Sequence, residues 1–174
     1  MKKQILLAVI VFCLVFALVG CAGAEVYTSN PRVQIVSNEY FTAELEPQLK
    51  PGQNFFATFR FVLTNRTTKE LQIDWENTNY LLNGRRNGRF LWEGVTWDGL
   101  KEISSNPLIP VAPGDTLTSV IFPKDLVGRG SAMTTGGVQY TQGPLPEGEN
   151  GILLFVSQNG KVVREKMEVT IEVQ

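Results

Sequence analysis

Hydrophobic and polar side chains alternate along much of the chain with a period of two residues. The alternation is strongest over residues 55–63, where one row consists of Phe55, Ala57, Phe59, Phe61 and Leu63. Successive side chains of a β-strand point to opposite faces of a sheet, so this row predicts a strand with an inward apolar face. Residues 65–68 have the composition of a turn, and a second alternation follows over residues 71–76. Together these segments predict a hairpin.

The C-terminal segment predicts a second hairpin. Residues 152–157 and 161–173 flank Asn159-Gly160, a dipeptide that favours a type I′ turn because both positions need a positive φ. In the second arm the inward row is Val163, Met167, Val169, Ile171 and Val173, and the outward row is Val162, Arg164, Lys166, Glu168, Thr170 and Glu172. Glu165 interrupts the inward row, which is expected near the exposed end of the strand.

The remaining pattern also favours strands over helices. Further strands are predicted at residues 32–37, 40–45, 79–82, 90–97 and 116–122. The proline-rich segment 107–115 is expected to be a connector or an edge strand. Segment 123–151 is rich in Gly and Pro and is expected to be a loop region with at most a short strand at 138–141. The pattern therefore predicts an all-β domain, a single antiparallel β-sandwich of about seven to eight strands.

The N-terminus has a different character. An unbroken apolar run from Ile5 to Val19 follows Lys2 and Lys3, and it is shorter than the roughly 20 residues of a membrane-spanning helix. This arrangement is typical of a secretory signal peptide. Cleavage before Cys21 would leave a single cysteine, which cannot form an internal disulfide.

Leu18-Val19-Gly20-Cys21 resembles the lipobox of bacterial lipoproteins. The resemblance implies a signal peptide at residues 1–20, removed by lipoprotein signal peptidase, and a lipid on the sulfur of Cys21. Two or more acyl chains anchor a protein stably to a membrane. Residues 21–31 would then be a lipidated tether and residues 32–174 the folded domain. An uncleaved anchor helix is the alternative, and it too would tether the domain.

The same resemblance carries an expectation about location. Ala22 after the cysteine favours the outer membrane in a bacterium with two membranes, and the plasma membrane is expected in a bacterium with one. The whole chain also resembles small bacterial lipoproteins that carry one immunoglobulin-like sandwich behind the lipidated cysteine. That resemblance implies an immunoglobulin-like fold and supplies no function.

Charge and composition exclude several function classes. Without Lys2 and Lys3, the chain has 14 basic and 17 acidic side chains, a net charge of −3. This charge argues against a nucleic-acid partner. The chain has no histidine, which removes Ser-His-Asp triads, Cys-His pairs and His-containing zinc sites. A P-loop and a dinucleotide fingerprint are also missing. We therefore assign no catalytic, cofactor-binding or metal-binding residue from the sequence.

One cluster of residues suggests partner binding. It consists of Arg85, Arg86, Arg89, Trp92 and Trp97, and it begins just after a predicted turn at Asn83-Gly84. Arginine and tryptophan are enriched at binding hot spots. The hypothesis is a rim that grips an acidic protein or a glycan. The alternative is that Trp92 lies in the core and that the arginines are solubilising residues of a turn.

The sequence therefore predicts a non-enzymatic, membrane-anchored envelope lipoprotein that binds a protein or glycan partner or assists an assembly. The competing hypothesis is a cell-wall glycan hydrolase that uses paired carboxylates. Asp74 and Glu76, expected on one face of a strand, and Glu93 and Asp98, which flank an aromatic segment, are its candidates.

Overall fold

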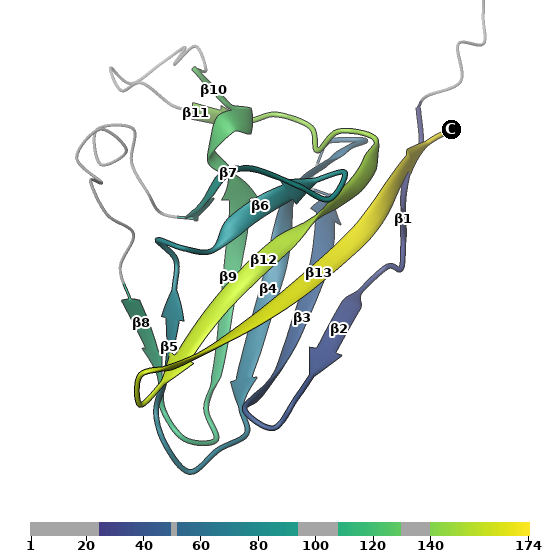
Figure 1. The fold of residues 1–174 in the computed structure, drawn as a ribbon. Helices are drawn as coiled ribbons and strands as arrows, with labels where there is room; N and C mark the ends of the chain where they lie inside the picture. Colours follow the sequence, from purple (N-terminus) through teal and green to yellow (C-terminus); the bar gives the residue numbers. More distant parts are fainter. Residues whose placement is uncertain (1–24, 50–51, 94–107, 130–139) are drawn as a thin grey trace, which may run out of the picture.

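The computed structural model describes residues 25–49, 52–93, 108–129 and 140–174, and the structural statements below concern these residues. They form an all-β fold, which confirms the predicted class. Eleven strands form one curled antiparallel sheet, and its two halves pack against each other (Figure 1). A separate two-stranded hairpin lies at the upper end in that view.

The two halves of the sheet are built as follows. The front half contains β1 (Tyr27–Asn30), β13 (Lys161–Val173), β12 (Gly148–Gln158), β6 (Asn79–Leu82), β5 (Leu71–Asp74) and β8 (Leu108–Val111). The back half contains β2 (Gln34–Ser37), β3 (Phe41–Leu49), β4 (Phe56–Asn65) and β9 (Thr116–Pro123). The separate hairpin is β10 (Val127–Arg129) with β11 (Tyr140–Gln142), preceded by the 3-10 turn η1 (Lys124–Leu126).

Strand β7 (Arg85–Trp92) joins the two halves. Its first part pairs with β6 in the front half, and its last three residues pair with β9 in the back half. The register with β6 shifts between Asn79 and Leu81, and Gly88 has a φ of +93°. A bulge of this kind bends a strand and increases its twist, which lets β7 change partners. Gly88 suits the position because a residue without a Cβ adopts positive φ at little cost.

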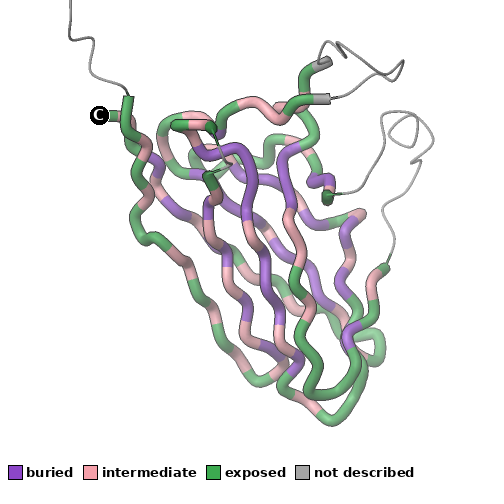
Figure 2. The backbone as a smooth tube through the Cα atoms, turned by 180° about the vertical axis from the view of Figure 1, so that it is seen from behind, coloured by how far each residue is buried: buried purple, intermediate pink, exposed green. Residues whose placement is uncertain are grey.

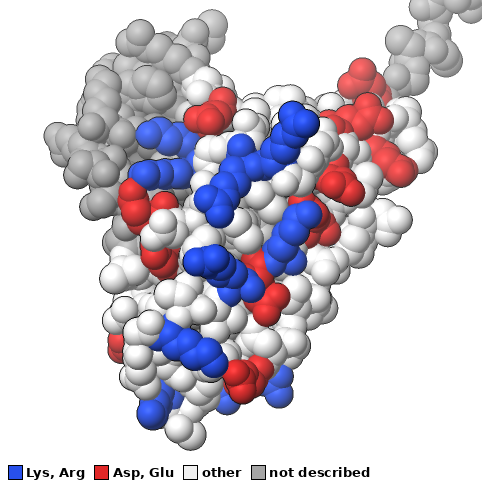
Figure 3. All heavy atoms as spheres, viewed as in Figure 1, with Lys and Arg blue, Asp and Glu red and all other residues white. Residues whose placement is uncertain are grey.

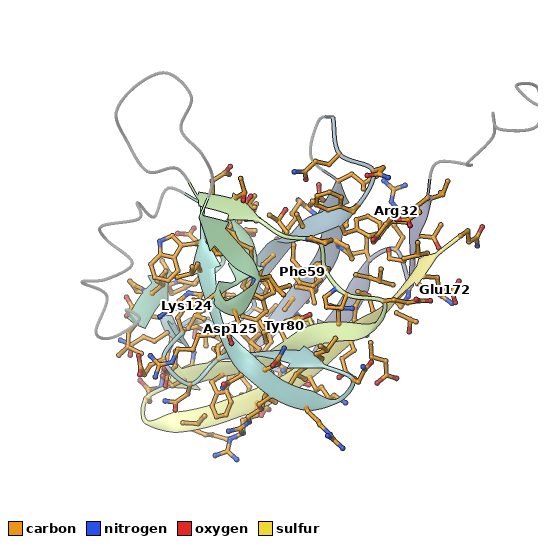
Figure 4. All side chains as sticks on the ribbon, turned by 90° about the horizontal axis from the view of Figure 1, so that it is seen from above. Arg32, Phe59, Tyr80, Lys124, Asp125 and Glu172 are labelled. Carbon is orange, nitrogen blue, oxygen red and sulfur yellow. The ribbon has the colours of Figure 1, made fainter. Side chains whose placement is uncertain are left out.

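The interior is dominated by aromatic rings in edge-to-face contact. Trp75 lies 5.5 Å from Phe61 between ring centroids, and Tyr80 lies 5.8 Å from Phe90. Figure 4 shows Phe59 and Tyr80 between the two halves, while Arg32 and Glu172 lie at the outside. Burial follows the central strands, and exposed residues are found mainly in turns and edges (Figure 2). Aromatic pairs in this geometry stabilise a core beyond the area that they bury.

The long C-terminal hairpin agrees with its prediction. Strand β13 spans the predicted residues, and Asn159 and Gly160 have φ values of +50° and +79°, as a type I′ turn requires. The structure also explains Glu165, which interrupts the inward row of β13. Its Oε1 atom accepts a hydrogen bond of 2.8 Å from the Asn38 amide in the turn between β2 and β3. This bond links the free edge of β13 to the back half.

Three expectations need correction. The structure has thirteen strands in its described residues, where about seven to eight were expected. The expected tether 21–31 ends earlier, because Tyr27–Asn30 form β1 against β13 and Val26 bonds to Gln174. The expected loop region 123–151 contains η1, β10, β11 and the start of β12. The unexpected strands β1 and β10 have only four and three residues, too few to display an alternating pattern.

A buried polar pair contributes to the core and gives a first prediction. The Tyr80 hydroxyl donates to Asn150 Oδ1, and Asn150 Nδ2 donates to the carbonyls of Pro146 (2.7 Å) and Gly148 (3.0 Å). We expect Tyr80→Phe to lower the free energy of unfolding by about 1–2 kcal/mol, because the buried Asn150 oxygen loses its phenol donor. Urea denaturation followed by circular dichroism measures this difference. An unchanged stability would contradict the role of the pair.

Burial also raises the pKa of Tyr80 above the ordinary value of about 10. The unfolded chain therefore loses this proton first as the pH rises, so the stability contributed by neutral Tyr80 is complete below pH of about 10 and declines above it. In an absorbance titration, the protein and Tyr80→Phe should gain the same tyrosinate signal until unfolding begins. An earlier excess in the unsubstituted protein would show that the Tyr80 phenol ionises in the folded state.

Candidate binding surface

Strands β7, β6, β12 and β13 lie side by side, and their registers align residues across all four. One row is Arg86, Leu81, Gly151 and Glu168, and the next is Arg89, Asn79, Leu153 and Lys166. The intervening row of Tyr80, Ile152 and Met167 is fully buried in the core. Because neighbouring rows point to opposite faces of a sheet, the first two rows point outward.

We call this outward surface the basic face. Its basic members are Arg86, Arg89, Arg164 and Lys166, and its apolar members are Leu81, Leu153 and Phe155. Figure 3 views the molecule from this side and shows Lys and Arg spread over it, with acidic residues among them and a further acidic group near β1. The name of the face refers to its four cations, and the whole chain has a formal net charge of −1.

Two of the outward apolar side chains are covered. Leu81 is 3% exposed and Phe155 is 9% exposed, although both belong to outward positions. The guanidinium carbon of Arg164 lies 5.1 Å from the centroid of the Phe155 ring. A guanidinium over an aromatic face is attracted by the ring, and its aliphatic stem shields apolar surface. The basic face thus combines a row of cations with an apolar strip beneath them.

Two acidic side chains on this face are engaged in ion pairs with its cations. Glu76 bonds to Arg89 at 2.6 Å, and Glu168 bonds to Lys166 at 2.6 Å. Across the described part of the chain, no carboxylate lies within 4.0 Å of the guanidinium groups of Arg86 or Arg164. Arg86 and Arg164 are therefore the cations of the face that an added carboxylate could pair with directly.

The structure separates the arginines of the predicted cluster from Trp92. Arg85, Arg86 and Arg89 lie in the first part of β7, and a hollow of about 490 Å³ is lined there by Leu82, Asn83, Arg85, Arg86 and Asn87. Trp92 ends the same strand, where it is half-buried against the core. It lines a cavity of about 80 Å³ together with Trp75, Ile109 and Leu117. Trp92 is therefore partly buried against the core, at the other end of β7 from Arg85 and Arg86. Trp97 and Cys21 lie outside the described residues.

The sequence did not place Arg164 and Lys166 at the site. The alternation of residues 161–173 assigns both to an outward row, but it carries no information about the strands that flank them. The continuous apolar run at Ile152–Val156 was a usable signal, because it indicates a strand covered on both faces. Here the outward cover comes in part from Arg164 of the neighbouring strand.

The candidate carboxylates have structural partners. Strand β5 ends at Asp74, so the expectation that Asp74 and Glu76 share a strand face is wrong. Asp74 instead closes the following turn, accepting hydrogen bonds from the Asn77 backbone (3.0 Å) and side-chain amide (2.7 Å). Glu93 is exposed just after β7, and Asp98 lies outside the described residues. Within the described ranges, no three His, Cys, Asp or Glu side chains gather closely enough to hold a metal ion.

Comparisons with known proteins return no match: no protein-family model fits the chain, and neither curated proteins nor solved structures resemble it significantly. Among the residues that the structure describes, no helix is long and apolar enough to cross a membrane. The features of this protein that bear on function are therefore the basic face and the N-terminal sequence.

Proposed function

We propose that the protein is a lipid-anchored envelope lipoprotein that binds an acidic protein or glycan partner through the basic face and performs no catalysis. The observation that carries the proposal is a pair of cations, Arg86 and Arg164, that have no carboxylate partner among the described residues, with Arg164 lying over the Phe155 ring. A surface with exposed arginine and apolar contact area has the composition of binding hot spots. Tethering raises the local concentration of such a module at the membrane.

The anchor in this proposal is the lipid on Cys21, supported by the sequence Leu18-Val19-Gly20-Cys21 after a basic and apolar leader. Tyr27, the first residue of β1, follows six residues later, a distance of at most about 20 Å along an extended chain. The domain would therefore stay close to the membrane. The outer membrane is the proposed location in a bacterium with two membranes, and the plasma membrane in a bacterium with one.

Binding is favoured over glycan hydrolysis by the positions of the carboxylates. Glycosidases need two carboxyl groups that face one substrate across a short gap. Asp74 holds a turn and Glu76 holds Arg89, so both carboxylates have structural partners. For these reasons we do not propose a catalytic role for them.

We further propose that the domain is an immunoglobulin-like sandwich. Two observations support this proposal: two antiparallel halves enclose one aromatic core, and the N-terminal stretch contributes β1 to one half and β2 to the other. Strands that change sheets at a corner are a feature of packed two-sheet folds.

The proposed tethering predicts a specific crosslinking result. We expect crosslinking in membranes of the producing cell, followed by purification of the tagged protein, to recover a partner that is lost with Cys21→Ser. The reason is that the untethered protein no longer meets the partner at a high local concentration. Membrane fractionation of both forms provides the control for anchoring. Recovery of the same partner by both forms would contradict a role for the tether, and no partner with either form would contradict the binding function.

A further inference from the structure

We infer that the basic face takes an extended acidic segment of a protein, with apolar residues between its carboxylates. This inference rests on the proposed function and names the partner class of the same site. It follows from three properties of the face, which are the spacing of its cations, the chemistry of arginine and the apolar strip beneath the cations.

The first property is spacing. Arg164 and Lys166 project from the same side of β13, about 7 Å apart along the strand. Arg86 lies on β7, three strands away from β13 and in register with Glu168, so it is displaced from Arg164 by about 14 Å across the sheet and about 13 Å along the strands. Alternate side chains of an extended peptide also repeat every 7 Å or so. Carboxylates at alternate positions of a partner therefore match the repeat of Arg164 and Lys166.

The second property is the chemistry of the cations. A guanidinium group binds a carboxylate through two parallel hydrogen bonds, which makes arginine suited to carboxylate recognition. Arg86 and Arg164 have no carboxylate partner in the described part of the chain. Lys166 pairs with Glu168 on the surface, with side-chain exposures of 52% and 19%. The Lys166 ammonium has three donors and is half exposed, so it can bind a partner carboxylate while it keeps its contact with the largely buried Glu168.

The third property distinguishes a protein from a simple polyanion. On the same face Leu153 is half-buried and accessible to a partner, whereas Leu81 and Phe155 are covered. A sulfated or phosphorylated polymer would use the cations and leave Leu153 without apolar contacts. A peptide with leucine or phenylalanine between its acidic residues would use both, because burying apolar area adds to binding. Charge and apolar surface together therefore favour an acidic, partly apolar polypeptide.

Direct binding of a synthetic probe tests the inference. The probe is a fluorescent ten-residue peptide that alternates Glu and Leu, added to the full chain in neutral detergent and followed by anisotropy. We expect the double substitution Arg86→Gln with Arg164→Gln to raise the Kd about tenfold, since two charge-assisted contacts are lost. The matched control, Arg32→Gln with Lys69→Gln, makes the same charge change away from the face and should leave the Kd within about twofold.

The apolar strip is tested separately. Leu153→Ser should weaken the Glu-Leu peptide about fivefold through lost apolar contact. It should leave the binding of dextran sulfate, a polyanion without apolar groups, unchanged. The inference is overturned if a Glu-Ser peptide binds as tightly as the Glu-Leu peptide, or if dextran sulfate outcompetes both. It is also overturned if the control pair weakens binding as much as the pair on the face, because the attraction would then be unspecific.

The same substitutions separate this inference from the proposed function. In the membrane crosslinking experiment, the Arg86 and Arg164 double variant should lose the partner while the control variant keeps it. A partner that depends on Cys21 but survives loss of both arginines would leave the tethered binding function in place and overturn the basic face as its site. Loss of partner capture in all forms would instead overturn the function itself.

Discussion

Asn65→Ala is expected to lower the free energy of unfolding by about 3 kcal/mol. The reason is that the buried side-chain amide of Asn65 bonds both to the turn between β4 and β5 and to the end of β8. The Asn65 side chain is 1% exposed. Its Nδ2 atom donates to the carbonyls of Lys69 (2.8 Å), Val111 (2.9 Å) and Ala112 (3.1 Å). Its Oδ1 atom accepts from the Thr67 backbone at 2.9 Å. Alanine would remove all of these bonds, including the one to the carbonyl of the buried Val111.

Urea denaturation of Asn65→Ala and of two comparison variants measures this effect. Asn65→Asp keeps the acceptor but cannot donate to the three carbonyls, so it should destabilise the fold at least as much as alanine. Asn54→Ala is the matched control, because Asn54 is exposed and makes one hydrogen bond of 3.3 Å to the Glu25 carbonyl. It should stay within about 0.5 kcal/mol of the unsubstituted protein. A loss below about 1 kcal/mol in Asn65→Ala would refute the proposed role.

Gly151→Val is expected to destabilise the protein by more than about 3 kcal/mol and to impair folding. Gly151 pairs with Glu168 in the long hairpin, where the backbones of β12 and β13 approach closely. A Cβ atom at position 151 would lie 2.1 Å from the Met167 carbonyl oxygen and 2.9 Å from the Glu168 Cα. These neighbours are backbone atoms, so they can move only if the hairpin deforms.

Gly128, another glycine within a strand, provides the control for the substitutions at Gly151. Among the described residues, an added Cβ at Gly128 would meet nothing closer than 3.7 Å, so Gly128→Ala should leave the stability nearly unchanged. Thermal unfolding and soluble yield, measured for Gly151→Ala, Gly151→Val and Gly128→Ala, give the expected order of damage. The account of close backbone approach would fail if Gly151→Ala were as stable as Gly128→Ala.

The long elements of this fold could be predicted because side-chain alternation and turn chemistry agree there. In the C-terminal hairpin, Asn159 and Gly160 fix the turn, and the inward row fixes the register. The change of partner along β7 could not be predicted. It depends on a bulge at Gly88 and on which strands reach its two ends, and neither property leaves a periodic signal in the sequence.

The candidate site, too, could be predicted from the sequence only in part. The sequence identified Arg85, Arg86 and Arg89 as a cluster because they are close along the chain. It could not predict that Arg164 lies on the same face, because that neighbourhood arises from the pairing of β12 with β6 and β13. It grouped Trp92 with the arginines, but Trp92 lies beyond the bulge of β7 and packs into the core. Local clusters are visible in a sequence, and surfaces assembled across strands are not.

The pairing of β1 with β13 has a mechanical consequence. Four consecutive residues, Tyr27–Asn30, pair with Val173–Thr170, and Val26 and Gln174 exchange two further hydrogen bonds of 3.0 Å. A force that enters the domain at Glu25 pulls along β1, whereas the hydrogen bonds between antiparallel strands run perpendicular to it. The bonds of the whole strand therefore share the load in shear and do not open one after another. If a bound partner is pulled away from the proposed membrane anchor, the force loads the pairing of β1 with β13 in shear. This is the direction in which the hydrogen bonds of the strand resist together.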